Sequence, residues 1–133
     1  MSIFLILLAA GDSKRLKSST SKPFHIVNNK TLLEHSFNAF KNFNEIKKTI
    51  IVYNKKHKKH LNKLNLKNTI KVIGGKTRQE STLIALKRIK KMNCRKVLIH
   101  DSARPNPSKD LVNKVIYNLK KNHAVVPVIK IND

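Results

Sequence analysis

The chain has 133 residues, 40% of them hydrophobic, which suits one domain with a core and excludes disorder throughout. Its 29 lysines and arginines against 7 acidic residues give a net charge of +22, which would attract a polyanion such as nucleic acid but also follows from codon drift in an A+T-rich genome. The single cysteine, Cys94, excludes an internal disulfide, and no apolar run is long enough to span a membrane, so we expect a cytoplasmic protein.

Five short apolar runs divide the chain, and none shows the strict alternation of a strand with one face in water. Such runs are typical of parallel strands that are buried on both faces. In chain order, we expect strands at residues 3–8, 49–53, 69–73, 96–100 and 124–129.

Helical patterns lie between these runs, at residues 31–43, 55–64, 77–92 and 108–122. Thr31 precedes Glu34 and Thr77 precedes Glu80 at the spacing of a capping box, which predicts a helix start at each threonine. Strands that alternate with helices indicate an α/β fold, with a Rossmann-like, mostly parallel sheet and helices on both faces. Ligands of such sheets bind beyond the carboxyl ends of the strands.

The first strand is followed by Ala9, Ala10 and Gly11 and then by a basic loop. Small residues let a ligand approach the backbone, and Arg15 and Lys22 would complete a phosphate cradle with backbone amides. In the alternative interpretation, Gly11 only turns the chain and the basic side chains are solvated. The spacing matches neither the P-loop nor the dinucleotide-binding glycine motif.

The third strand ends in Gly74 and Gly75, and a helix with Arg78 and Ser81 near its first turn begins directly afterwards. The amides and the dipole of a helix N-terminus favour a polar or anionic ligand. The alternative is that the two glycines only make the turn.

The fourth strand runs into Asp101, Ser102 and Arg104. A carboxylate at this edge of the sheet suits Mg²⁺, which binds one or two carboxylates together with substrate phosphates. Arg104 would hold an anion or form a purely structural pair with Asp101. The three strand ends together indicate a nucleotide-binding site.

Three segments, in this order and at these separations, resemble the 2-C-methyl-D-erythritol 4-phosphate cytidylyltransferase family of the non-mevalonate isoprenoid pathway. They read LAAGDSKRL…SKP, GGKTRQES and HDSARP, and the resemblance covers essentially the whole chain. It implies a fold of the nucleotide-diphospho-sugar transferase type. Family members usually carry proline before the catalytic lysine, whereas here Ser21 precedes Lys22 and Pro23 follows.

The resemblance implies which residues meet CTP. Ala9, Ala10 and Gly11 would lie against the nucleotide, while Arg15 and Lys22 would be catalytic and stabilise charge on its phosphates. The reaction implied is attack by the 4-phosphate of methylerythritol phosphate on the α-phosphorus of CTP, with pyrophosphate leaving in line.

The other two segments would complete the site. Gly75 and Ser81 would help to read cytosine, and Arg78 belongs to the same nucleotide-binding motif. The remaining roles implied are Mg²⁺ binding by Asp101, contact of Ser102 with the ribose, and contact of Arg104 with the sugar-phosphate acceptor.

Members of this family are considerably longer than 133 residues, so we expect a single nucleotidyltransferase domain, residues 1–133, that is incomplete at its C-terminus. In the family, the later part supplies a dimerisation arm and further substrate contacts, which implies a homodimer for the full-length protein.

Two alternatives remain open. Ribitol-5-phosphate cytidylyltransferase shares the glycine-rich loop and the start of the fourth-strand segment, although Ala103 favours the erythritol enzyme. A basic nucleic-acid-binding protein belongs to another class, and we do not expect it because aromatic residues make up only 5% of the chain and the charge is spread along it.

Overall fold

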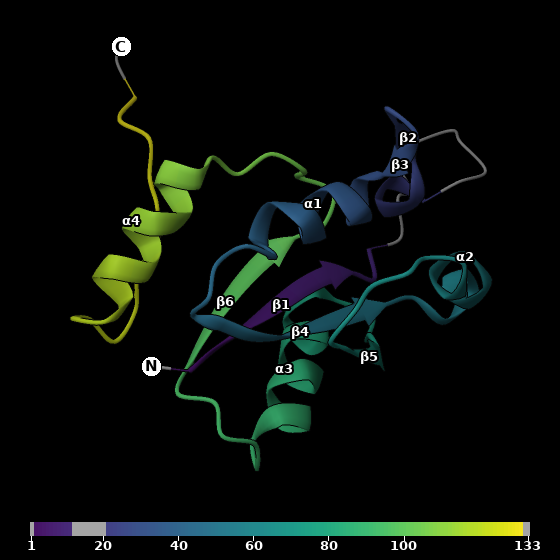
Figure 1. Ribbon diagram of the computed structural model, residues 1–133. Helices are drawn as coiled ribbons and strands as arrows, with labels where there is room; N and C mark the ends of the chain where they lie inside the picture. The colour runs from purple at the N-terminus through teal and green to yellow at the C-terminus, as the bar shows by residue number, and fades with distance from the viewer. Residues whose placement is uncertain (1, 12–20, 132–133) are drawn as a thin grey trace.

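The centre of the computed structural model, which describes residues 2–11 and 21–131, is a parallel sheet of four strands (Figure 1). The strand order is β5-β4-β1-β6, and every neighbouring pair is parallel. The bounds are β1 Ile3–Ala9, β4 Ile46–Tyr53, β5 Thr69–Ile73 and β6 Lys96–Asp101. The first four predicted strands are therefore confirmed, with β4 beginning earlier than expected.

The continuous apolar run of β1 serves both faces of the sheet. Successive side chains of a strand point to opposite faces. Ile3, Leu5, Leu7 and Ala9 accordingly enter one buried cluster, whereas Phe4 and Ile6 enter the other. Such a strand has no face for water, which is why its sequence shows no alternation.

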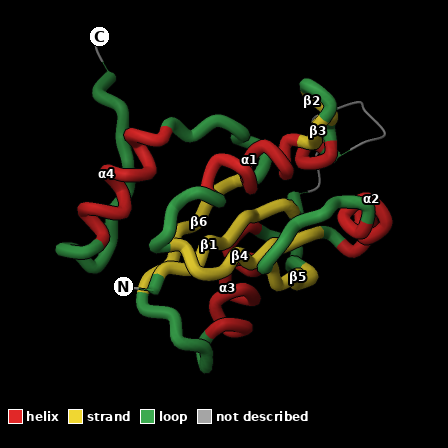
Figure 2. Tube along the Cα trace, in the orientation of Figure 1, coloured by secondary structure: helices red, strands yellow, loops and turns green. Residues whose placement is uncertain are grey.

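Helices cover both faces, as predicted. Figure 2 shows α1 (Leu32–Phe40) and α3 (Arg78–Ile89) on opposite sides of the sheet. Val112 and Ile116 of α4 (Lys109–Leu119) join the cluster on the side of α1, and so does Leu61 of α2 (Lys58–Asn62). Ala85 of α3 lies in the cluster on the other side.

The capping residues begin the two helices where the sequence predicts. At α1 the box is complete, because Thr31 Oγ1 accepts the amide of Glu34 and the glutamate accepts the amide of Thr31. At α3, Thr77 Oγ1 accepts the amide of Glu80 at 3.1 Å, but the carboxylate of Glu80 accepts the amide of Lys76 at 2.8 Å. The second box is thus half formed, and its glutamate stabilises the preceding turn.

Two short elements differ from the prediction. The expected helix at residues 55–64 divides into a 3-10 turn, η2 (Lys55–His57), and the short α2. A small hairpin of β2 (Ile26–Val27) and β3 (Lys30–Thr31) precedes α1 and was not predicted. Asn28 and Asn29 form its turn with φ of 51° and 67°, a conformation that asparagine tolerates better than most residues.

The fifth predicted strand, at residues 124–129, is wrong for the part of the chain that the structure describes. The segment follows α4 without strand pairing, and Val126 and Ile129 are 77% and 90% exposed. β-branched residues favour a strand only when a neighbouring strand pairs with them. Within residues 2–11 and 21–131, no helix combines the length and the apolar character that crossing a membrane requires.

Candidate functional site

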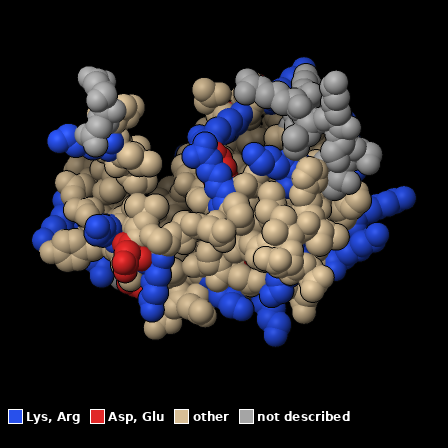
Figure 3. Space-filling view, turned by 90° about the horizontal axis from the view of Figure 1, so that it is seen from above, with Lys and Arg blue, Asp and Glu red and all other residues tan. Residues whose placement is uncertain are grey.

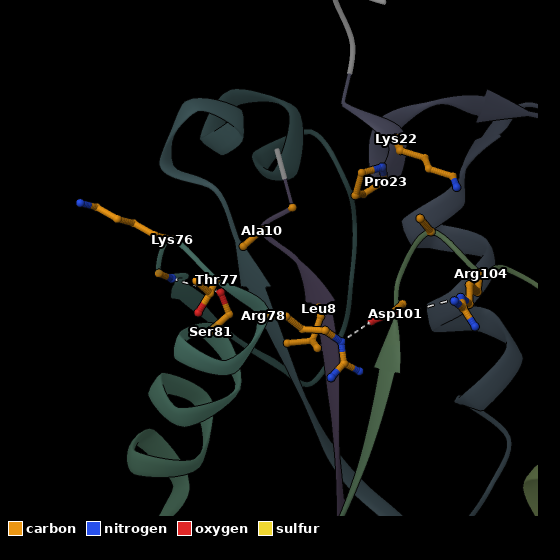
Figure 4. A pocket seen from close by; sticks show the side chains of 13 residues that line it. Leu8, Ala10, Lys22, Pro23, Lys76, Thr77, Arg78, Ser81, Asp101 and Arg104 are labelled. Atoms are coloured by element: carbon orange, nitrogen blue, oxygen red, sulfur yellow. Dashed lines mark hydrogen bonds and ion pairs between the residues drawn. The ribbon is translucent and has the colours of Figure 1, made fainter. Parts of the chain in front are cut away.

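A pocket of about 380 Å³ opens at the carboxyl ends of β1, β5 and β6 (Figure 4). The chain leaves β1 toward β4 on one side and returns to the other side of β1 at β6. This reversal is the point at which open α/β sheets bind their ligands. The predicted site residues that line the pocket are Ala10, Gly11, Lys22, Gly75, Arg78, Ser81, Asp101 and Arg104.

The end of β1 provides an open backbone. A Cβ atom added to Gly11 would meet no atom of the described residues within 4 Å, so this part of the structure leaves space beside Gly11 for a ligand. Ala9 was also predicted to lie against the nucleotide, but its side chain is fully buried in the core beneath the pocket. Arg15, the first predicted catalytic residue, lies outside the described residues.

Lys22 reaches the pocket from a 3-10 turn, η1 (Lys22–Phe24). Ser21 is the extended residue before the turn, and Pro23 occupies its start, where the fixed φ of proline is favourable. Phe24 is buried, with its ring centre 5.5 Å from that of His57 and 5.6 Å from that of His60. The unusual order Ser21, Lys22, Pro23 therefore produces an anchored turn, with Lys22 at the mouth of the pocket.

The turn between β5 and α3 forms the second wall. The amide of Gly75 donates a hydrogen bond of 3.1 Å to Ser81 Oγ, so this buried serine joins the turn to the helix. A Cβ on Gly74 would lie 2.5 Å from the Cβ of Ala10 and 2.8 Å from Ser81 Oγ. Glycine at position 74 is what lets the ends of β1 and α3 approach each other.

The third wall carries an acid between two arginines. Asp101 Oδ1 lies 3.2 Å from Arg78 Nε, and Oδ2 lies 3.8 Å from Arg104 Nε. The predicted structural pair of Asp101 and Arg104 is present, and Arg78 adds a second partner. The arginine side chains are 61% and 81% exposed, and exposed pairs of this kind contribute only about 0–1 kcal/mol, so a ligand can displace them at little cost.

Ser102 has a different place from the one predicted. It is fully buried, its hydroxyl donates a hydrogen bond of 2.7 Å to the carbonyl of Leu8, and its side chain does not line the pocket. Ser102 follows the last residue of β6, and its amide and hydroxyl both donate to the Leu8 carbonyl of β1, so the side chain is directed into the protein rather than toward the pocket. Five further residues that line the pocket were not predicted as site residues, and they lie in or beside the three motif segments: Leu8, Pro23, Lys76, Thr77 and Ala103.

Of the described residues that line the pocket, Asp101 is the one that offers a carboxylate to a cation. Among the described residues, no three histidine, cysteine or acidic side chains come together in a way that could hold a metal ion. A single carboxylate fits Mg²⁺ when the phosphates of a nucleotide supply further ligands, and it does not fit a resident metal held by the protein alone.

Comparisons of the sequence with known proteins all identify the same family. A sequence model of the 2-C-methyl-D-erythritol 4-phosphate cytidylyltransferase (IspD) family matches residues 3–133. The chain is 48% identical, over its whole length and 36% of the other protein, to the bifunctional enzyme IspD/IspF of Pelagibacter ubique. It is 40% identical, over 86% of the chain and 50% of the relative, to the 2-C-methyl-D-erythritol 4-phosphate cytidylyltransferase of Wigglesworthia glossinidia brevipalpis.

Solved structures agree with the sequence relatives. The bifunctional IspDF of Campylobacter jejuni superposes with a TM-score of 0.78 at 30% identity, over 91% of this chain and 31% of that one. The 4-diphosphocytidyl-2C-methyl-D-erythritol synthase of Anaerococcus prevotii superposes with a TM-score of 0.75 at 29% identity, over 91% and 52%. The chain therefore spans about half or less of the proteins named here.

Proposed function

The chain belongs to the 2-C-methyl-D-erythritol 4-phosphate cytidylyltransferase family, and we propose that it transfers the CMP group of CTP to 2-C-methyl-D-erythritol 4-phosphate. The observation that carries this proposal is the meeting of three separate motif segments at one pocket, with Lys22, Arg78 and Asp101 around it. Because the chain spans only part of its relatives, the activity, the substrates and the partners of the whole protein are all part of the proposal.

The reaction joins two anions. An oxygen of the 4-phosphate attacks the α-phosphorus of CTP, the new P–O bond forms, and the bond to the bridging oxygen of pyrophosphate breaks, with the electron pair leaving on pyrophosphate. No covalent enzyme intermediate is needed. Catalysis then consists of positioning the reactants and neutralising their charge, which are effects worth several kcal/mol in a site of fixed cations.

Each wall of the pocket has a part in this reaction. Lys22, together with Arg15 outside the described residues, would hold the phosphates of CTP. The Gly75 turn, which Ser81 holds from α3, would receive the cytosine, and the exposed backbone at Ala10 and Gly11 would lie beneath the nucleotide. These roles follow from the matching positions of the family motifs.

Asp101 would hold Mg²⁺ beside the phosphates. When bound, this cation supplies charge neutralisation to the leaving pyrophosphate. Arg78 and Arg104, which pair with the carboxylate, would then be released to contact phosphate groups. Arg104 would face the acceptor, and a homodimer of the full-length protein would contribute the rest of the acceptor site.

The test is release of pyrophosphate from CTP by the complete product of the gene, with methylerythritol phosphate and with ribitol 5-phosphate as separate acceptors. We expect turnover with methylerythritol phosphate. Turnover with ribitol 5-phosphate alone would assign the enzyme to the other acceptor. Turnover with neither, together with tight and salt-sensitive binding to RNA or DNA, would refute the enzyme function.

Figure 3 shows basic side chains dispersed over one face rather than gathered in a stripe, which favours the enzyme over a nucleic-acid-binding protein.

A further inference from the structure

The segment from Asp101 to Arg104 is a tight turn at the rim of the pocket. The amide of Arg104 donates to the carbonyl of Asp101 at 3.0 Å. The Asp101 end belongs to the sheet, where Asp101 is the register partner of Leu8 and both the amide and the hydroxyl of Ser102 donate to the Leu8 carbonyl. No strand among the described residues pairs with the Arg104 end.

Two side chains outside the pocket hold that end. Ser36, in the middle of α1 and fully buried, donates through its hydroxyl to the carbonyl of Ser102 at 2.7 Å and lies 3.3 Å from the carbonyl of Arg104. A serine in a helix interior is neutral to unfavourable for the helix itself. Because Ser36 is buried against two carbonyls of the turn, we assign it to holding the turn rather than to stabilising the helix.

His100 approaches the same carbonyl from β6. Its Nε2 lies 2.6 Å from the carbonyl oxygen of Arg104. A carbonyl only accepts, so the imidazole carries its proton on Nε2 and donates it. The ring of Phe40, on α1, contacts the imidazole edge to face with 5.1 Å between ring centres, which fixes the direction of this donor.

We infer that Ser36 and His100 are positioning residues that direct Arg104 toward the acceptor phosphate. The amide of Arg104 donates to Asp101, its carbonyl accepts from His100, and Ser36 holds the preceding Ser102 carbonyl from 2.7 Å, so the backbone on both sides of Arg104 is fixed before any ligand arrives. Neither donor lines the pocket. The inference rests on the proposed function, because it assigns Arg104 to the acceptor side.

A reciprocal pair of variants at position 100 separates the hydrogen bond from the packing. His100→Phe keeps a ring against Phe40 and removes the donor. His100→Gln removes the ring and carries an amide N–H at the same number of bonds from Cβ as Nε2. We expect kcat/KM for methylerythritol phosphate to fall roughly tenfold in His100→Phe, since small displacements of a substrate-contacting group reduce rates strongly, and to remain near wild type in His100→Gln.

A loss of kcat/KM for the acceptor alone distinguishes a positioning role from a general loss of stability, which would impair the use of both substrates. KM for CTP should stay unchanged in His100→Phe and in Ser36→Ala, because the sheet holds the Asp101 end independently. Thr69→Val is the control, since it removes a hydrogen bond of 3.0 Å from Thr69 to the carbonyl of Leu66 at the opposite end of the sheet. It should leave both kinetic constants at wild-type values.

Two results would overturn the inference while the wild type remains active. One is the reverse order at position 100, with His100→Gln impaired and His100→Phe normal, which would make packing the role of the ring. The other is an equal loss for CTP and for the acceptor in Ser36→Ala. If the wild type has no activity, the proposed function has failed, and a crystal structure of His100→Phe with the Asp101–Arg104 turn in its wild-type position would then contradict the inference separately.

Discussion

Arg78 on α3 and Asp101 at the end of β6 face each other across the pocket, with 3.2 Å between Nε and Oδ1 (Figure 4). The two residues belong to different motif segments and are 23 positions apart in the sequence. Their ion pair joins the wall assigned to cytosine to the wall assigned to the metal. A cation bound at Asp101, as proposed, would compete with this arginine for the carboxylate, and we therefore expect nucleotide binding to change the position of Arg78.

Asp101→Asn tests the role of the carboxylate. In the presence of Mg²⁺, we expect the affinity for CTP to fall by about tenfold or more, since the amide does not replace a charged oxygen ligand. Without a divalent cation the variant should bind CTP at least as tightly as wild type, because Arg78 and Arg104 no longer pair with an acid. Calorimetric titration measures both values, and Asp110→Asn on α4 is the charge-matched control. Equal Mg²⁺-dependent affinities in Asp101→Asn and wild type would remove Asp101 from the metal site.

Lys22→Ala should leave the melting temperature unchanged, since Lys22 is exposed while Pro23 and Phe24 anchor its turn. The turnover number should fall roughly 10²- to 10³-fold, the typical loss when one fixed group that stabilises transition-state charge is removed. Steady-state kinetics of the complete gene product provide the measurement. Lys90→Ala, at the far end of α3, changes the net charge equally and should keep full activity. Full activity in Lys22→Ala would show that the loop was misassigned.

Gly74→Ala and Gly11→Ala should affect different properties, the first the stability of the fold and the second the affinity for CTP. A Cβ at position 74 collides with Ala10 and Ser81, so we expect a loss of stability of about 1–3 kcal/mol, measured by urea denaturation. A Cβ at position 11 meets no atom within 4 Å in the part of the chain that the structure describes, so we expect stability to stay the same while the affinity for CTP falls. Unchanged CTP affinity in Gly11→Ala would mean that the nucleotide does not lie against this backbone.

The thiol of Cys94 should react slowly with alkylating reagents in the folded protein. Burial raises the pKa of the Cys94 thiol, and hydrogen bonds with the backbone of Phe4 and Lys96 offset this only in part. The fraction of thiolate at a given pH is therefore smaller than in a free cysteine, and alkylation by iodoacetamide should be slower until the chain is unfolded in urea. Alkylation of the folded protein at the rate of a free thiol would contradict a packing role.

The sequence was sufficient where local chemistry decides the structure. The unbroken apolar run of β1 requires burial on both faces, and Thr31 and Thr77 mark helix starts by the hydrogen bonds they accept. The sequence was insufficient where the structure of a segment depends on whether another strand pairs with it. Residues 124–129 have the composition of a strand, but no described strand pairs with them.

The same distinction applies to the site. Lys22, Arg78 and Asp101 were predicted because charged residues after buried strands point to a ligand. Ala9 follows the face of Ile3, Leu5 and Leu7 into the core, and the alternation along β1 alone would have predicted that its side chain is buried. Ser36 has no signal in the sequence, since a serine in an amphipathic helix resembles any solvated polar residue until the turn after β6 is seen against it.

The most direct test of the account is whether CTP and Mg²⁺ bind at the ends of β1, β5 and β6. Amide chemical shifts of the isotopically labelled chain, recorded during titration with CTP and Mg²⁺, report this residue by residue. We expect saturable shifts at Gly11, Gly75, Arg78 and Asp101, and little change at Thr69 on the opposite end of the sheet. Shifts confined to other surfaces, or no saturable shifts with CTP, would contradict it.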